Sequence, residues 1–278
     1  MTEQGWFSGL DPDDVESAAI AIREGHADEP RDWPAEAVQS DFVPDRSTYY
    51  RRLQEAAIRA TSEAVRDRER ADDQQLVHAV RTMDDLSDVG NELAERAAEW
   101  AGSHYGETRE GLDYVEEVAD RAPDGPVEER IVSLARRSLD VLEERADLRT
   151  FVTSQTPTVA PNLSMLAGPV LAARLISIAG SLESLAKKPS GTVQVLGAED
   201  ALFAHLRGHA PSPKHGIIYT HEYVRETPPD QRGSASRALA GKLSIAARID
   251  YYSGDRRPEL ATELDRRIER IRGRGPEE

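Results

Sequence analysis

Apolar residues recur at helical spacing along two long stretches of the chain. In the first stretch the separations are three or four residues, at Leu76, Val80, Met83, Leu86, Val89, Leu93, Ala97 and Trp100. In the second they alternate strictly between four and three, at Val127, Ile131, Leu134, Ser138, Val141, Arg145, Leu148 and Val152, with Ser138 and Arg145 as polar interruptions. A repeat of about 3.5 residues is typical of a coiled-coil seam.

A segment rich in turn residues separates the two seams. Residues 101–126 hold Gly102, Gly106, Gly111, Pro123, Gly125 and Pro126. The pattern predicts an antiparallel coiled-coil hairpin over 49–157, and the alternative is two amphipathic helices of an ordinary bundle. The residues predicted at the coiled-coil interface are Leu76, Val80, Met83, Leu86, Val89, Leu93, Ile131, Leu134, Val141 and Leu148.

The remaining segments predict a mainly α fold with two shorter flanking regions. Residues 1–48 are broken by Pro, Asp and Gly and form a short N-terminal region. Pro157 and Pro161 are expected to end the hairpin, and Asn162 to cap a helix with its buried stripe at Leu163, Leu166, Val170, Leu175, Ile178 and Leu182. Further helices over about 198–207 and 233–250 complete a compact all-α domain at 158–252. Residues 253–278 read as a solvated, charged C-terminal helix and tail.

Composition narrows the class of protein. No run of 18 apolar residues, no cysteine and no basic-then-apolar leader is present, so we expect a soluble cytoplasmic protein without disulfides. The net charge is −16, and arginine provides 31 of the 35 cations. This acidity fits either adaptation to a salt-rich, halophilic cytoplasm or a surface for a basic partner, and we favour the first.

Charge is distributed unevenly along the sequence. Residues 1–159 carry 18 arginines against 37 Asp and Glu, whereas residues 160–250 carry 10 Lys and Arg against 7 Asp and Glu. All four lysines, Lys187, Lys188, Lys214 and Lys242, lie in this second stretch. A basic segment within an acidic chain indicates where a polyanion docks.

Sequence signatures of catalysis are missing. The chain has no P-loop, no G-x-G-x-x-G and no H-E-x-x-H. His205 and His209 are four residues apart, but without a clear third ligand two surface histidines are the better interpretation. We therefore expect no cofactor, no metal and no enzymatic activity.

Three motifs in the basic segment favour contact with nucleic acid. In LGAEDALF (196–203) a glycine precedes a helix, whose N-terminus can bind an anion, although this motif taken alone favours a simple helix cap. There Glu199 can accept from a base amino group or favour the helix dipole. In PKHGIIY (213–219) Lys214 can pair with phosphate and His215 can stack on a base, or the loop is a polar surface turn.

The third motif is RGSASRALAGKLSIAARID (232–250). Arg237 and Arg248 are eleven residues apart and differ by only ~20° around a helix. They flank a strip of small residues that suits a phosphate backbone or a protein–RNA junction, while Arg232 and Lys242 extend the positive surface. The alternative is buried small-residue packing with two structural arginines.

These motifs, in this order, resemble the Nop domain, over the run APNLSMLAGPVLAARLISIAGSLESLAKKPSGTVQVLGAEDALF and the two motifs after it. Upstream, EWAGSHYGE (99–107) is similar to the segment after the first coiled-coil helix of archaeal Nop-domain proteins. The resemblance covers roughly residues 49–250. One departure is Asp200, where the family usually has a lysine after Gly-Ala-Glu. Another is the N-terminal region, which is much shorter than usual.

The resemblance implies a scaffold of box C/D small ribonucleoproteins. Such a scaffold binds a kink-turn guide RNA held by a ribosomal-type protein, self-associates through its coiled coil into a homodimer, and holds the methyltransferase fibrillarin through its N-terminal region, for 2′-O-methylation of rRNA or tRNA. Residues 1–48 would be a reduced fibrillarin-binding part. The residues implied to face RNA or partner are Gly197, Ala198, Glu199, Lys214, His215, Gly216, Arg232, Arg237, Lys242 and Arg248. Two alternatives stay open: a coiled-coil adaptor whose Nop-like domain no longer binds RNA, and a helical enzyme that uses carboxylates and His215.

Overall fold

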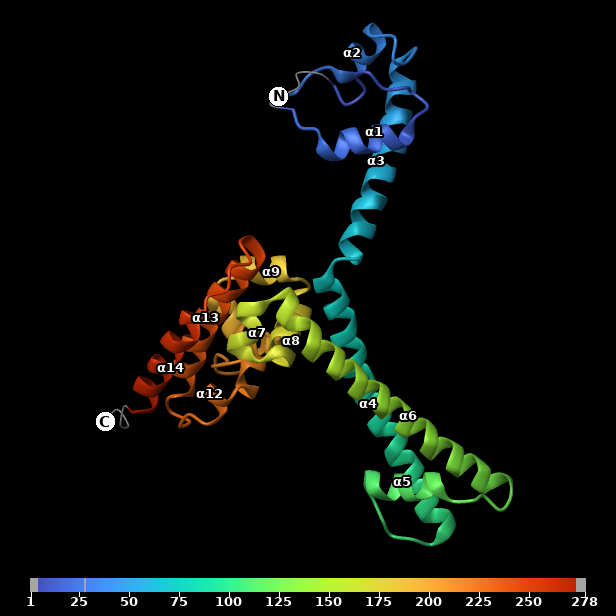
Figure 1. Ribbon diagram of the computed structural model, residues 1–278, viewed down its shortest axis with the longest axis vertical. Helices are drawn as coiled ribbons and strands as arrows, with labels where there is room; N and C mark the ends of the chain where they lie inside the picture. Colours follow the sequence, from blue (N-terminus) through green and yellow to red (C-terminus); the bar gives the residue numbers. More distant parts are fainter. Residues whose placement is uncertain (1–4, 28, 274–278) are drawn as a thin grey trace. The chain divides into compact units, whose positions relative to one another are not determined.

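The computed structural model of the chain describes residues 5–27 and 29–273. Within these residues the regular structure consists of helices and no strands (Figure 1), which confirms the prediction of a mainly α fold. The chain divides into two compact units, residues 1–71 and 72–278, and each is described by itself.

Aspartates begin the helices of the first unit. Its helices are α1 (Val15–Glu24), α2 (Trp33–Gln39) and α3 (Arg46–Glu69). Asp14, Asp32 and Asp45 occupy the three N-cap positions, and each side chain accepts a hydrogen bond from a backbone N–H in the first turn. In this region these three Asp residues therefore mark the starts of the helices.

An aromatic cluster forms the core of this unit. Phe7, Phe42 and Tyr49 are buried, and the Trp6 indole Nε1–H donates to the Tyr49 hydroxyl at 3.1 Å. Because Tyr49 lies on α3, the boundary expected between residues 48 and 49 falls inside this helix, which belongs to the first unit.

The second unit begins with the predicted hairpin. It is built from α4 (Asp72–Tyr105), α5 (Leu112–Asp120) and α6 (Pro126–Val159), and α4 and α6 run antiparallel in Figure 1. The expectation that Pro157 ends the hairpin is wrong, because α6 continues to Val159. Pro157 lies in the last turn, where a missing N–H costs a single helical hydrogen bond.

The seam between α4 and α6 differs from the predicted one in its distal half. Leu76, Val80 and Met83 are buried as predicted, but Val89 is 49% exposed. A Cβ placed on Gly90 would lie 2.7 Å from a Leu142 methyl carbon, so the helices approach most closely at small residues.

In the distal half of the seam, α4 contributes alanines: Ala94, Ala97 and Ala101 are buried, whereas Trp100 is 42% exposed. The predicted place of Val89 within the hairpin is therefore wrong. Of the other predicted interface residues Ile131 is buried, and partly buried are Leu86, Leu93, Leu134, Val141 and Leu148.

Hydrogen bonds fix the base of the hairpin to the rest of the unit. The Leu182 N–H donates to the Asp73 carboxylate at 2.9 Å, and the Gln74 side-chain amide donates to the Gly180 carbonyl at 3.0 Å. Arg174 pairs with Asp84 further along α4. The hairpin therefore begins from a defined position on the domain that follows.

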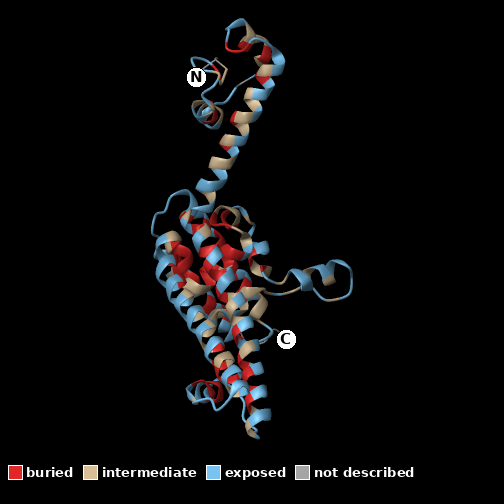
Figure 2. Cartoon of the chain, turned by 90° about the vertical axis from the view of Figure 1, so that its right-hand side faces the viewer, coloured by how far each residue is buried: buried red, intermediate tan, exposed pale blue. Residues whose placement is uncertain are grey.

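The C-terminal domain, residues 160–273, packs short helices around one long central helix. Its helices are α7 (Pro161–Ala167), α8 (Pro169–Ala179), α9 (Leu182–Lys187), α10 (Ser190–Val195), α11 (Glu199–Leu206), the 3₁₀ helix η1 (Ile217–Thr220), α12 (Glu222–Arg225), α13 (Arg232–Tyr252) and α14 (Glu259–Arg272). Buried residues concentrate in this domain (Figure 2), and on α13 they include Leu239, Leu243 and Ala246.

The single helix expected from Leu163 onward is two helices. Gly168, at φ +74°, separates α7 from α8, and the helices bend by 117° there. Ile178, expected in the buried stripe, is 41% exposed. No single helix in the described ranges is long and apolar enough to cross a membrane; α7 and α8 pass that test only as a bent pair, by length and composition.

Asn162 joins α7 to α13 rather than capping a helix. The N-cap of α7 is Ala160. The backbone N–H groups of Asn162 and Leu163 donate to the Asp250 carboxylate at 3.0 and 2.8 Å, and the Asn162 amide donates to Asp250 at 2.6 Å. Desolvation raises the Asp250 pKa, and these bonds oppose that rise.

The C-terminal helix is a core element, not the solvated helix expected from its charge. Leu260, Leu264, Ile268 and Ile271 of α14 are buried in the main cluster of the domain. Their spacing of four, four and three residues makes an apolar stripe on a helix that is otherwise charged. The domain expected to end at residue 252 therefore extends through α14.

Candidate nucleic-acid interface

A left-handed glycine turn leads into α11. Gly197 has φ +81°, and its N–H donates to the Glu199 carboxylate at 2.9 Å. A Cβ at Gly197 would lie 3.3 Å from the Cβ of Ile217. Glu199 thus bonds to the turn that precedes its own helix, while Ala198 occupies the N-cap position without a side-chain capping bond.

The end of α10 supports the Lys214–Gly216 loop. The Gly216 N–H donates to the Gln194 carbonyl at 2.9 Å, and the Gln194 side-chain amide donates to the Lys214 carbonyl at 2.7 Å. A Cβ on Gly216 would lie 2.0 Å from the Leu196 carbonyl oxygen. The close approach that requires this glycine is to the chain itself rather than to a ligand.

His215, Tyr219 and Arg232 form a layered stack beside this loop. The rings of His215 and Tyr219 are stacked, with centroids 4.6 Å apart and 23° between their planes. The Arg232 guanidinium carbon lies 5.5 Å from the centre of the Tyr219 ring, and Arg232 donates to the Thr227 carbonyl at 3.0 Å. The imidazole is therefore held flat against a fixed neighbour.

Burial and a nearby cation favour the neutral form of this imidazole. Burial, followed by the nearby charge of Arg232, lowers the pKa of His215 below the usual histidine range. A neutral ring that is partly exposed and already oriented can stack on an unpaired base without first losing a proton.

Lys214 and Arg237 meet at a surface hollow of about 520 Å³. Gly191, Gly233 and Asp230 also line it. Both cationic residues are exposed, and Asp230 is the only acidic residue in this lining. The hollow therefore offers two positive charges beside the His215 stack.

Residues 124–272 match the family model described as Nop: snoRNA binding domain, fibrillarin. The chain belongs to the Nop family. The match begins just before α6 and ends with α14, so it contains the whole candidate interface.

Relatives of this Nop-family chain come from archaea and eukaryotes. It is 49% identical over 146 residues to an uncharacterised NOP5 family protein of Methanocaldococcus jannaschii, covering 52% of the chain and 35% of the relative. It is 32% identical over 239 residues to nucleolar protein 56 of Saccharomyces cerevisiae, covering 71% and 47%. The chain thus spans between a third and half of the length of these relatives.

A solved structure resembles nearly the whole chain. It is a chain in the crystal structure of a fibrillarin/Nop5p complex, with a TM-score of 0.54 and 25% sequence identity. The alignment covers 96% of this chain and 98% of that one. The likeness supports the all-α architecture predicted from the sequence.

Lys242 and Arg248, which were also predicted to face RNA, make structural contacts in this Nop domain. Lys242 pairs with Glu263 of α14, and only 17% of its side chain is exposed. Arg248 donates from Nε to the Ala186 carbonyl at 3.1 Å, although much of it stays exposed. Lys214 and Arg237 line one hollow, His215 follows Lys214 in the chain, and Lys242 is not part of that lining. Contact with RNA stays a prediction for all of these residues.

The histidines of α11 and the following loop show no metal geometry. His205 donates from Nδ1 to the Ala210 carbonyl, 3.0 Å away. Within the described residues no group of three His, Cys, Asp or Glu side chains could hold a metal ion.

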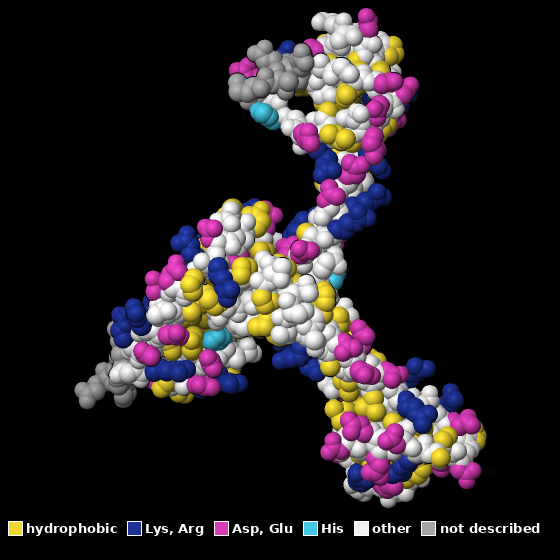
Figure 3. Space-filling model, viewed as in Figure 1, with side chains coloured by type: hydrophobic (Ala, Val, Ile, Leu, Met, Phe, Trp, Pro, Cys, Tyr) yellow, Lys and Arg dark blue, Asp and Glu magenta, His cyan; other side chains and the backbone are white. Residues whose placement is uncertain are grey.

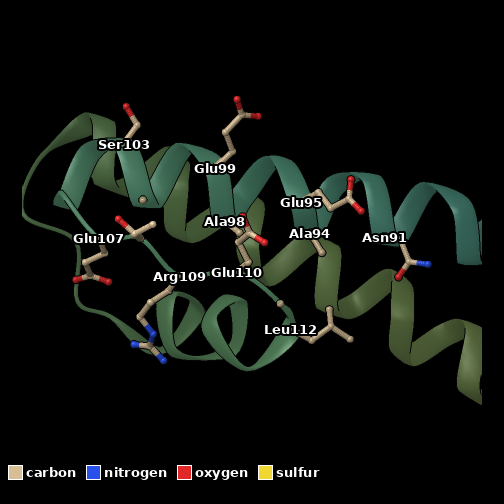
Figure 4. Close-up of a pocket in the computed structure, with 13 residues that line it drawn as sticks. Asn91, Ala94, Glu95, Ala98, Glu99, Ser103, Glu107, Arg109, Glu110 and Leu112 are labelled. Carbon is tan, nitrogen blue, oxygen red and sulfur yellow. The ribbon is translucent and has the colours of Figure 1, made fainter.

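A second hollow, of about 760 Å³, lies at the hairpin tip between α4 and the loop before α5. Glu95, Glu99, Glu107 and Glu110 line it with Arg109, and Figure 4 shows Glu99 pointing away from the loop. Acidic side chains, with arginines among them, gather over the tip in Figure 3. This charge disfavours RNA, and the Lys214 hollow is the better nucleic-acid candidate.

Sequence reasoning missed two residues that build the interface. Tyr219 supports the His215 ring, and Gln194 fixes the Lys214 carbonyl. The four-residue separation of His215 and Tyr219 was a usable signal for contact within one turn-like segment. Gln194 gave no such signal, because it lies 20 residues from Lys214.

Proposed function

We propose that this chain is a non-catalytic RNA-binding scaffold of a box C/D ribonucleoprotein. It would join a kink-turn guide RNA to a fibrillarin methyltransferase for 2′-O-methylation of rRNA or tRNA. The observation that carries the proposal is the Nop-domain match, which contains the cationic hollow and the His215 stack of an otherwise acidic chain. The scaffold brings the RNA and the methyltransferase into one particle, so its contribution to the reaction is orientation.

In this proposal the RNA partner is a kink-turn already bound by a ribosomal-type protein. Lys214 and Arg237 contact phosphates, and His215 stacks on a base that the kink leaves unpaired. Asp200 is exposed in the first turn of α11, where it disfavours a phosphate. This end of α11 is therefore better suited to the protein partner than to the RNA.

The fibrillarin partner rests on the structural likeness. The similar chain comes from a fibrillarin/Nop5p complex, and the likeness extends over almost all of this chain, including residues before the Nop match. The unit of residues 1–71, with its aromatic core, is the part that would hold the methyltransferase.

The test is affinity capture of the tagged chain from its own cells at native salt, with sequencing of bound RNA and identification of bound proteins. We expect box C/D guide RNAs together with a fibrillarin-like methyltransferase. Capture of the methyltransferase without RNA, from a lysate in which guide RNA is abundant, would instead establish the adaptor alternative. A chain that captures neither is not this scaffold.

We also propose that the chain forms a homodimer through the hairpin. Val89 and Trp100 of α4 are exposed, outside the seam with α6, and with the partly buried Leu93 they form one stripe at helical spacing. Large apolar side chains aligned on a helix surface are typical of an interaction face.

The dimer proposal predicts a loss of association when this stripe is charged. We expect Val89→Asp with Trp100→Asp to weaken self-association by at least about 100-fold, because two desolvated apolar contacts per protomer are replaced by like charges. Sedimentation velocity across a concentration series measures the effect. Val65→Asp, at an exposed apolar residue of α3, is the control. An unchanged dimer in the double variant, or a monomeric native chain, contradicts the proposal.

A further inference from the structure

Two adjacent tyrosines are exposed at the end of α13. Tyr251 is 40% and Tyr252 is 66% exposed, and their ring centroids are 4.8 Å apart with 73° between the planes. No core cluster of the described residues includes either ring. Exposed aromatic rings next to one another are a surface on which unpaired bases can stack.

Cations surround this pair. Lys187 ends α9, and Lys188 follows it. Burial and the Glu183 carboxylate raise the pKa of Tyr251, and Lys187 partly opposes this rise, so Glu183 and Lys187 both lie near the tyrosine hydroxyl. Arg248 is one helical turn before Tyr251 and Tyr252, and its guanidinium is held by the carbonyls of Ala186 and Lys188 at 3.1 and 3.4 Å. Two of the chain's four lysines therefore lie beside its exposed tyrosine pair.

The acid next to these cations is already neutralised. Glu183 pairs with Lys187 at 2.6 Å on the surface, with 40% and 59% of the two side chains exposed. Exposed pairs of this kind contribute little to stability, so Lys187 can exchange the carboxylate for a phosphate at small cost.

The tyrosine pair is continuous with the cationic hollow along one side of α13. The Lys188 carbonyl accepts a hydrogen bond from the Ser244 hydroxyl at 3.4 Å, which fixes the link between α9 and α10 across the middle of α13. Further along that link, Gly191 lines the hollow together with Arg237. Arg237 and Tyr251 are fourteen residues apart, so the path is ~21 Å long.

We propose that a single-stranded RNA segment, continuing from the RNA held at the hollow, follows this path and binds at its far end. We call the residues that bind it there the tyrosine strip: Lys187, Lys188, Arg248, Tyr251 and Tyr252. The cations contact its phosphates, and the two rings stack on its bases. This inference rests on the proposed function, because the hollow must hold RNA for a strand to leave it along α13. Stacking is independent of base identity, so the strip accepts any sequence.

The experiment compares two RNAs on the full-length chain. One is a kink-turn RNA bound by the ribosomal-type protein, and the other carries a single-stranded adenylate extension of roughly ten nucleotides, a length within known single-strand site sizes. Versions with the extension at the 5′ and at the 3′ end are both measured. We expect one of them to bind about tenfold more tightly than the RNA without an extension.

Substitution of the tyrosines separates the strip from the hollow. Tyr251→Ala with Tyr252→Ala should remove the tenfold gain and leave the affinity for the unextended RNA unchanged. The double Phe variant should keep the gain, since the rings remain. Tyr50→Ala, at a tyrosine of α3 that is 56% exposed, is the matched control.

The salt dependence of binding distinguishes the phosphate contacts of the lysines from the base stacking of the tyrosines. Lys187→Gln with Lys188→Gln should reduce the slope of log affinity against log salt for the extended RNA, because fewer counterions are released. The tyrosine variants should leave that slope unchanged.

Four outcomes would overturn the tyrosine strip. If the native chain binds the kink-turn but neither extension adds affinity, or the double Ala variant keeps the gain, the strip is refuted and the scaffold function stands. If the tyrosine variants lose a bound protein but the RNA extension still increases their affinity, the strip binds a protein rather than RNA. If the native chain binds neither RNA, both proposals fail.

Discussion

Reversal of two charges at the hollow should remove most of the affinity for kink-turn RNA. We expect Lys214→Glu with Arg237→Glu to weaken binding on the order of 100-fold at about 0.15 M salt. The loss has two sources, the counterions that two phosphate contacts no longer release and the repulsion from two new carboxylates. Both residues are exposed, so the fold should be kept. Equilibrium binding to a kink-turn RNA carrying its ribosomal-type protein measures the effect.

A matched control separates the effect of where the charges lie from the effect of the net charge of the chain. Arg130→Glu with Arg137→Glu makes the same charge change at two exposed arginines of α6, on the hairpin. We expect this control to bind RNA within about threefold of the native chain, because at 0.15 M salt the screening length is only about 8 Å. Equal losses in the two double variants would show that RNA binding follows net charge alone, and the assignment of the hollow would then be withdrawn.

Replacement of Gly216 by alanine should destabilise the C-terminal domain by about 3 kcal/mol, the upper part of the range for forced overpacking. The new Cβ would lie 2.0 Å from the Leu196 carbonyl oxygen, and that oxygen accepts the Ile217 N–H at 2.8 Å. The loop therefore cannot keep both this hydrogen bond and its position. Denaturant unfolding followed by circular dichroism gives the change in the free energy of unfolding.

Gly191→Ala is the control for this substitution. Gly191 lies on α10, one turn before Gln194, and a Cβ there meets nothing within 4 Å. We expect a change of less than about 1 kcal/mol, in the stabilising direction, since alanine lowers the entropy of the unfolded chain. If Gly216→Ala unfolds like the native chain, the close approach of the loop to α10 is not a requirement of the fold.

The hairpin illustrates what periodicity can and cannot predict. The spacing of apolar residues located both long helices and their antiparallel pairing, because that spacing reports which side of a helix is apolar. It failed at Val89 and Trp100, because the rule that large apolar residues face inward favoured Val89 over Gly90. Close approach of two helices favours small residues, and the gain in packing depends on Leu142, which is more than 50 residues away.

The candidate site shows the same division between what the sequence predicts and what it does not. Motifs in the sequence located the loops of Gly197 and Gly216 and the helix of Arg237. They did not reveal that the Glu199 carboxylate accepts from the Gly197 N–H or that Lys242 is paired with Glu263. Each of these contacts engages a charged group that would otherwise be available to bind RNA. The partner of Lys242 lies on α14, a helix that the sequence suggested was solvated.

The sequence alone determined the helical class, the hairpin, the place of the basic segment and its family resemblance, because each of these depends on residue type and spacing within a short window. The tertiary structure decided which glycines are required, which cations remain free and which aromatic rings are left exposed. Those properties depend on atoms brought together from distant positions. Gly216 approaches Leu196, Lys214 and Arg237 line one hollow, and Tyr251 lies near Lys187 only after the chain has folded around α13.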